Sequence, residues 1–265
     1  MDSASEYHAG LAALRWQVEM GATEAIGDAP INRFEMPDKP PQRKTARKSL
    51  AQATSAPVSL PPPGAVDPVT IAREAAAASG DLDALHTALQ AFEHCQLKRG
   101  ARNTVFADGD PSSRVMVIGE APGRDEDLAG RPFVGRAGQL LDRMLAAIHL
   151  DRKAKGAGGS YITNVLPWRP PQNREPEPEE MAMLVPFLER HIELVAPNLL
   201  ILMGNTPCQA LLGRRGITRM RGKWVEALGL PVMPMFHPAY LLRNPAAKRE
   251  SWADLLDIQD RLRRF

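Results

Sequence analysis

The 265-residue sequence predicts an α/β fold: a three-layer α/β/α domain with a central four-stranded parallel sheet, preceded by an N-terminal helix and a Pro-rich linker. Three observations support this. After Arg114, short apolar runs alternate with longer stretches of helical periodicity. The apolar runs end in loop-forming polar residues, and hydrophobic residues make up 44% of the chain. Strands that alternate with helices in this way form a parallel sheet covered on both faces.

The elements of this domain follow one another in a regular order. The expected strands cover 115–119, 161–166, 198–203 and 231–236. The expected helices cover about 137–150, 178–195, 205–213 and 249–264. Each helix follows a strand, which is the arrangement that crossover connections between parallel strands require.

The residues before this domain divide into an extension and a linker. Residues 37–68 contain eight prolines among basic and small polar residues, a composition typical of a linker. Helical periodicity resumes at Val69, so the main domain is expected to cover 69–265. Within the extension, 1–36, a short amphipathic helix is predicted from the spacing of Leu11, Leu14 and Val18.

Composition limits the class of protein. Two cysteines cannot build a disulfide framework, which indicates a reducing compartment. The longest aliphatic run, 199–203, is too short to cross a bilayer, and no secretory signal pattern opens the chain. We therefore expect a cytoplasmic protein without membrane contact. The net charge is only +2, but residues 213–265 carry 11 Lys and Arg against 5 Asp and Glu. This suits a polyanion-binding face, with ordinary solvated charge as the alternative.

Three predicted strands each end in a distinctive polar residue. The first runs into Gly119-Glu120-Ala121-Pro122-Gly123, the second into Asn164, and the last into His237-Pro238. The carboxyl ends of parallel strands meet at one edge of a sheet, where ligand sites form. We therefore expect Glu120, Asn164 and His237 to share one pocket.

The motifs around these residues resemble one family. They are GEAPGRDED (119–127), GRPFVG (130–135), AGQLL (137–141), TNV (163–165), RPPQNR (169–174), RG (221–222) and HPAYLLR (237–243). In this order the set resembles a family 4 uracil-DNA glycosylase, from about Ala91 to the C-terminus. The resemblance implies a monofunctional enzyme that flips uracil out of DNA and hydrolyses its N-glycosidic bond, leaving an abasic site.

The resemblance assigns roles to the predicted pocket. His237 would donate to the uracil oxygen that gains charge as the base leaves. The amide of Asn164 can pair with both a carbonyl and an imide N–H, and Phe133 would stack on the flipped base beside Ala121. From the residues alone, His237 could instead cap a strand end, Asn164 could bond its own turn, and Phe133 could be an ordinary core residue.

The group that activates water is less plain from the sequence. In the wider superfamily an aspartate often stands where this chain has Ala121. We assign Glu120 a polarising and loop-fixing role. Positioning of water or of the surrounding loops is assigned to Pro122, Gly123, Glu126 and Asn173.

DNA contacts are expected mainly in the basic C-terminal segment. The resemblance implies that Leu241 and Leu242, on a loop after His237, would fill the gap left by the flipped nucleotide. From the residues alone they would be ordinary buried leucines. Arg221, Lys223 and Arg243 would face phosphates and make binding salt-dependent.

The sequence departs from the family at its cofactor. Family 4 enzymes usually hold a [4Fe–4S] cluster on four cysteines, and the corresponding positions here are Phe92, Cys95, Trp168 and Leu184. One thiol cannot ligate a cluster. No cofactor or metal is therefore expected, and an apolar plug is predicted in the cluster's place.

Three functional hypotheses are compatible with the sequence. The first is a monomeric hydrolase that acts on uracil in single- or double-stranded DNA. The second is a catalytically weak DNA-binding member of the fold. The third is a glycosylase of broader range, for which Ala121 leaves room.

Overall fold

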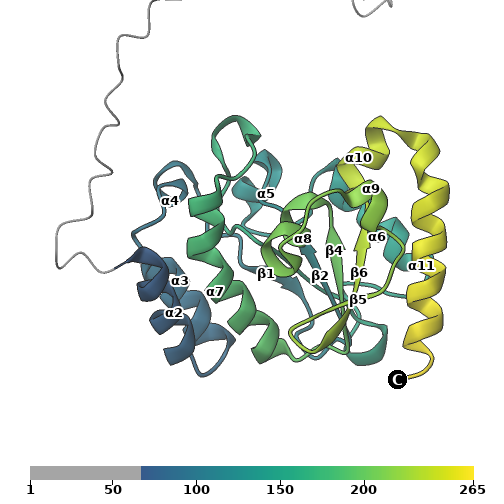
Figure 1. Ribbon diagram of the computed structural model, residues 1–265, viewed down its shortest axis with the longest axis horizontal. Helices are drawn as coiled ribbons and strands as arrows, with labels where there is room; N and C mark the ends of the chain where they lie inside the picture. Colours follow the sequence, from purple (N-terminus) through teal and green to yellow (C-terminus); the bar gives the residue numbers. More distant parts are fainter. Residues whose placement is uncertain (1–66) are drawn as a thin grey trace, which may run out of the picture. The chain divides into compact units, whose positions relative to one another are not determined.

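The computed structural model describes residues 67–265, so the predicted N-terminal helix and nearly all of the predicted linker lie outside them. Its centre is one six-stranded sheet with the order β1-β3-β2-β4-β6-β5 (Figure 1). The four inner strands run parallel to one another, as predicted. The strands are β1 (Ala107–Gly109), β2 (Val115–Gly119), β3 (Tyr161–Asn164), β4 (Leu199–Met203), β5 (Val225–Ala227) and β6 (Leu230–Met235).

Two edge strands make the sheet wider than the predicted four strands. β1 pairs antiparallel with β3, and β5 pairs antiparallel with β6. Each has only three residues, Ala107-Asp108-Gly109 and Val225-Glu226-Ala227, which is too short for an alternating pattern to be recognised. Such short strands are a common way to end a sheet.

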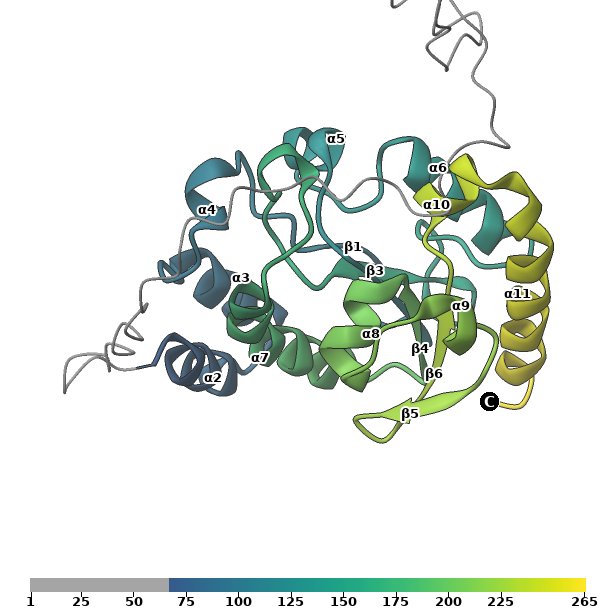
Figure 2. The ribbon, with the colours of Figure 1, turned by 45° about the horizontal axis from the view of Figure 1, so that its top comes forward.

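Helices cover both faces of the sheet (Figure 2). The alternation of side chains along β2 explains how the two faces are filled. Met116 and Ile118 point to one apolar cluster, while Val115 and Val117 point to the other. The first cluster is completed by α2 (Pro68–Ala78), α3 (Leu82–Ala91), α7 (Pro178–Val195) and α8 (Asn205–Leu212). The second is completed by α6 (Arg136–Ala146), α10 (Pro238–Arg243) and α11 (Lys248–Leu262).

Helix α7 has the predicted bounds, and the other predicted helices differ by a few residues at their ends. Four short helices were not predicted from the sequence: α4 (Leu97–Gly100), α5 (Arg124–Ala129), α9 (Ile217–Met220) and α10. One or two turns are too few for helical periodicity to show in a sequence. Between residues 67 and 265, no helix is long and apolar enough to span a membrane.

Candidate active site

A cleft of about 530 Å³ opens at the carboxyl edge of the parallel strands. The ends of β2, β3 and β6 bring Glu120, Asn164 and His237 to its lining. The structure thus brings together the three residues for which a shared pocket was predicted. Most of the other predicted site residues line it as well: Ala121, Pro122, Gly123, Glu126, Phe133, Asn173 and Arg243.

His237 is held as a neutral hydrogen-bond donor. It is the N-cap of α10, and its Nδ1 accepts a hydrogen bond from the backbone N–H of Ala239 at 3.1 Å. An accepting Nδ1 carries no proton, so the ring proton lies on Nε2. Burial, with a smaller contribution from the positive charge of Arg243, lowers the pKa of His237 to about 4. The imidazole is therefore uncharged at neutral pH and can donate from Nε2.

The Phe133 ring lies against this histidine. Only 6% of Phe133 is exposed, and its ring centroid lies 5.5 Å from that of His237, with 29° between the planes. Gly119, at the end of β2, makes the arrangement possible. A Cβ there would lie 2.4 Å from Oδ1 of Asn164 and 2.5 Å from the Phe133 ring. The glycine therefore lets an amide and an aromatic ring converge on the end of one strand.

Glu126 holds two loops of the cleft together. Its carboxylate accepts hydrogen bonds from the backbone N–H groups of Gly123 at 3.1 Å and of Val134 and Gly135 at 2.9 Å each. These three contacts join the loop after β2 to the loop that carries Phe133. Glu126 was predicted to position either water or the surrounding loops. These contacts are those of a residue that positions loops.

Glu120 has a partner that sequence reasoning missed. The hydroxyl of Thr206 donates to Oε2 of Glu120 at 2.6 Å. Thr206 is 4% exposed and lies in the first turn of α8, directly after β4. A polar residue just past the end of a central strand was the available signal for it. Asn173, in turn, accepts from Nε of Arg169 at 2.9 Å, a contact on the exposed rim.

Two predicted DNA contacts are corrected by the structure. Leu241 is only 1% exposed, because it lies on α10 rather than on a loop and packs into the second apolar cluster. Arg221 is engaged inside the protein: its Nε donates to Asp254 at 2.9 Å, and its guanidinium lies over the Phe236 ring. Neither side chain is free to meet DNA.

The other predicted DNA contacts remain accessible. Lys223 and Arg243 are exposed, and Leu242 is partly exposed on α10. Arg243 also lines the cleft, directly beyond the turn that carries His237. The C-terminal segment thus offers exposed cations and one partly exposed leucine, with Arg243 in the cleft lining itself.

The four positions that the family resemblance assigns to cluster ligands are buried, in the segment after α3, in the loop after β3 and in helix α7. Phe92, Cys95, Trp168 and Leu184 are 4%, 1%, 1% and 1% exposed and belong to one apolar cluster. Trp168 Nε1 donates to Oγ1 of Thr104 at 3.1 Å, and burial raises the pKa of the Cys95 thiol. Three of these four side chains lack an atom that could ligate iron, so the set does not fit a cluster. Over residues 67–265, no group of three or more His, Cys, Asp or Glu side chains is arranged to hold a metal ion.

The site thus lies at the carboxyl edge of an open, mainly parallel α/β sheet, the place where small-molecule sites form in such folds. A sequence model of the uracil DNA glycosylase superfamily matches residues 106–256 of this chain. With this match and the relatives below, the chain belongs to the uracil DNA glycosylase superfamily.

Three type-4 uracil-DNA glycosylases are among the similar proteins. The one from Archaeoglobus fulgidus is 38% identical over 186 residues, covering 67% of this chain and 91% of the relative. The one from Thermotoga maritima is 41% identical, covering 57% of this chain and 77% of the relative. The one from Pyrobaculum aerophilum is 37% identical, covering 66% and 91%.

Proposed function

We propose that this chain is a DNA-repair enzyme, a uracil-DNA glycosylase that hydrolyses the N-glycosidic bond of uracil in DNA. The observation that carries the proposal is the neutral His237 donor placed beside Phe133 and Asn164 in one cleft. The similarity to type-4 uracil-DNA glycosylases over most of the chain supports it.

Recognition of uracil rests on Asn164 and Phe133. The amide of Asn164 has both a carbonyl and an NH₂ group, which match the imide N–H and a carbonyl of uracil. Cytosine presents an acceptor at N3 and an amino donor where uracil has O4, so an amide held in the uracil-pairing orientation matches neither group. Phe133, whose ring lines the cleft, stacks on the base after it has been flipped from the helix.

His237 acts on the leaving base. As the C1′–N1 bond breaks, its electron pair moves onto the uracil ring and charge builds up on O2. The Nε2 proton of His237 donates to this oxygen, and the interaction is stronger in the transition state than in the bound substrate. The hydrogen bond from the Ala239 N–H already fixes the orientation of the neutral ring. The Nε2 donor is therefore in place before the bond breaks.

Water completes the hydrolysis at C1′. The water oxygen forms the new bond to C1′, one water proton is released, and the departing uracil anion takes up a proton after it leaves. Glu120, oriented by Thr206, is the carboxylate that we assign to polarising this water and fixing its loop. Backbone groups of Ala121, Pro122 and Gly123 border the same space.

DNA is held by those of the predicted DNA-contact residues that are accessible: Lys223, Leu242 and Arg243. Leu242 takes the place of the extruded nucleotide, because Leu241 is committed to the core. Lys223 and Arg243 contact phosphates, as their exposed charges allow. The same surface serves single- and double-stranded DNA.

We further propose that the enzyme works without an iron–sulfur cluster or any other cofactor, as a monomer in the cytoplasm. The support for the missing cluster is the side-chain chemistry of Phe92, Trp168 and Leu184, which are buried and apolar. The plug that they form with Cys95 joins the segment after α3, the loop after β3 and helix α7.

One experiment tests the activity. The purified full-length protein is incubated in excess chelator with duplexes that contain one U, hypoxanthine, xanthine or mismatched T, and with a single strand that contains one U. Abasic sites are scored by alkaline cleavage. We expect cleavage at U opposite G or A and in single strands. Binding of uracil DNA without cleavage would identify a binding protein instead. Comparable cleavage at the deaminated purines would identify a broader glycosylase.

A further inference from the structure

We propose that Arg152 is a positioning residue for the reaction: it fixes the turn that presents Phe133 to the flipped base. The proposal rests on the stacking role assigned to Phe133 above. Arg152 lies between α6 and β3, on the segment that returns the chain to the sheet. Nothing in its local sequence, Leu150-Asp151-Arg152-Lys153, marks it as different from any other charged loop residue.

The guanidinium of Arg152 is buried and fully occupied. Only 9% of its side chain is exposed. Nη1 donates to the carbonyl oxygen of Pro132 at 2.9 Å, and Nη2 donates to that of Phe133 at 3.1 Å. The planar fork thus spans two successive carbonyls, a geometry that lysine cannot reproduce.

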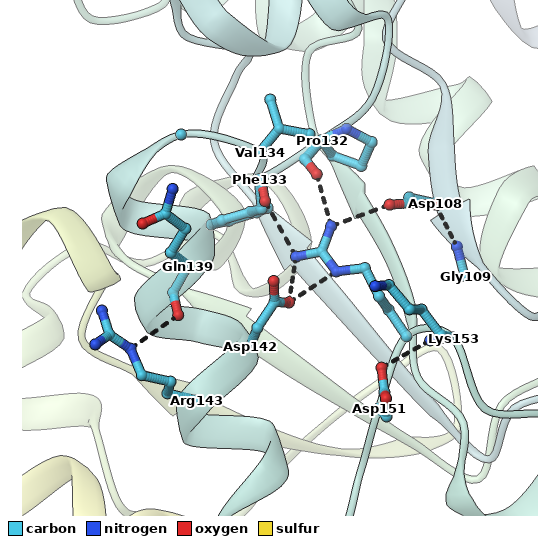
Figure 3. A network of polar contacts seen from close by, with 12 residues as sticks. Asp108, Gly109, Pro132, Phe133, Val134, Gln139, Asp142, Arg143, Asp151 and Lys153 are labelled. Atoms are coloured by element: carbon cyan, nitrogen blue, oxygen red, sulfur yellow. Dashed lines mark hydrogen bonds and ion pairs between the residues drawn. The ribbon is translucent and has the colours of Figure 1, made fainter.

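Two carboxylates hold the fork in place, as Figure 3 shows around Pro132 and Phe133. Asp108, in edge strand β1, accepts from Nη1 at 3.1 Å. Asp142, in α6, accepts from Nε at 2.8 Å and pairs with Nη2 at 2.6 Å. The charge of the buried arginine is therefore balanced, and its position is fixed from two separate elements.

The Phe133 turn needs such fixing. Phe133 has φ +53°, a left-handed conformation that a bulky residue rarely adopts. Arg152 holds the carbonyl side of this turn, and Glu126 holds its N–H side at Val134 and Gly135. Gly138 allows the close approach, since a Cβ there would lie 1.8 Å from the Phe133 carbonyl oxygen.

The consequence for the site follows from these contacts. The Phe133 ring lies against His237 in the lining of the cleft, while its own carbonyl is held by Arg152. Without the fork, the carbonyls of Pro132 and Phe133 would lose their partners, and the turn could relax toward an ordinary conformation. The ring would then move out of the plane in which the base must stack.

The test is a double-mutant cycle in the full-length protein. Single-turnover rates on a U:G duplex are measured for the parent, R152M, F133A and R152M/F133A, together with affinity for a duplex that holds a tetrahydrofuran abasic analogue. We expect R152M to lower the rate by about 10- to 100-fold, the effect of a misplaced stacking group. In the F133A background, R152M should change the rate by less than about threefold, because the ring that it positions is gone.

The abasic duplex separates positioning from a general structural defect. It contains no base to stack on Phe133, so R152M should bind it within about threefold of the parent. R190M is the matched control. Arg190 also donates twice to one backbone carbonyl, that of Ser79, and pairs with Glu193, but it lies on α7 against the end of α2. R190M should cleave uracil DNA at the parent rate.

The outcomes that overturn the proposal are distinct from those that overturn the stacking role. An F133A rate within about threefold of the parent would remove the stacking role, and with it the role of Arg152. If F133A is slow but R152M is not, or if R152M is equally harmful in both backgrounds, only the Arg152 proposal fails. If R152M does not fold, R152K takes its place in the cycle. It keeps the charge beside Asp108 and Asp142 but has one point donor for two carbonyls, and the same outcomes decide.

Discussion

At the scale of single residues, His237 depends on one backbone contact for its chemistry. The N–H of Ala239 holds Nδ1, so that Nε2 is left as the donor. His237→Ala removes that donor, and we expect turnover on uracil DNA to fall by about two to four orders of magnitude. The measurement is the single-turnover rate at saturating enzyme.

The control for this substitution is His94→Ala, an exposed histidine outside the cleft. It should leave the rate unchanged, and binding of uracil-free DNA should be the same for both variants. A loss smaller than about tenfold in His237→Ala would show that the side chain only caps α10.

Asn164 depends on having both a donor and an acceptor. It is 7% exposed at the end of β3, next to Gly119 and Phe133. Asn164→Asp cannot donate to a uracil carbonyl and places a negative charge beside the departing anion. We expect the cleavage rate on uracil to fall by at least about tenfold. Asn198→Asp, at an exposed amide just before β4, is the matched control. Equal rates for the two variants would remove Asn164 from the base-binding site.

At the scale of elements, the sequence predicted best where the pattern was long. The four parallel strands and α7 were found because several consecutive residues share a period set by burial. The three strand-end residues were found because a parallel sheet brings such ends to one edge.

Very short elements, and contacts between residues far apart in the sequence, were missed for a physical reason. The edge strands, each of three residues, are defined by backbone pairing with β3 and β6 and not by side-chain pattern. Leu241 was misplaced because one turn of helix buries it. The partner of Thr206 is 86 residues away in the sequence. The partners of Arg152 lie in β1, in α6 and in the loop before α6. The place of Thr206 just past a central strand could mark it as a candidate, but the sequence does not show which distant residue either side chain contacts.

The apolar plug gives an element-scale prediction. Trp168 is 1% exposed and belongs to the first apolar cluster, together with Phe92, Cys95 and Leu184. Trp168→Ala should lower the free energy of unfolding by roughly 3–5 kcal/mol, as for a buried aromatic side chain. Trp252→Ala, at 44% exposure on α11, is the control and should change it little. Urea unfolding compares the two, and iron analysis of the parent protein should find no stoichiometric iron. Iron in the parent, or equal stability of the two variants, would contradict the plug.

The contact between α7 and β3 gives a pH dependence. Nε2 of His191 lies 2.9 Å from the hydroxyl of Tyr161, and the ring stacks on Phe106. Burial, with a smaller contribution from His86, lowers the pKa of His191 to about 3. Below its ordinary pKa of 6.5, the unfolded chain therefore binds a proton that the folded chain does not. Stability is fully present above pH 6.5 and falls as the pH drops from there toward 3.

Urea unfolding between about pH 7.5 and 5 measures this effect. His191→Gln should flatten the dependence, because glutamine can also hydrogen-bond to Tyr161 but does not titrate. An unchanged slope in this variant would assign the acid sensitivity to other groups. His237 is one of them, since its pKa is also lowered, to about 4.

At the scale of the whole molecule, the last prediction concerns residues 1–66. Helix α2 begins at Pro68, and Asp67 caps it by accepting from the N–H of Val69, so a chain cut before Asp67 keeps its first helix intact. The superfamily match, 106–256, also lies entirely within the remainder. We expect the truncated chain, 67–265, to fold and to excise uracil at the parent rate at low salt.

The salt dependence of DNA binding should nevertheless change. The removed segment includes a basic cluster: Lys39, Arg43, Lys44, Arg47 and Lys48. Each phosphate contact adds about 0.9 to the slope of log K against log salt, so the truncated chain should show a shallower slope on duplex DNA. Replacing the five residues by Gln in the full-length chain is the matched control and should give the same shallower slope. Identical slopes in all three proteins would place the phosphate contacts entirely within 67–265, around Lys223 and Arg243, and aggregation of the truncated chain would show that this part does not fold independently.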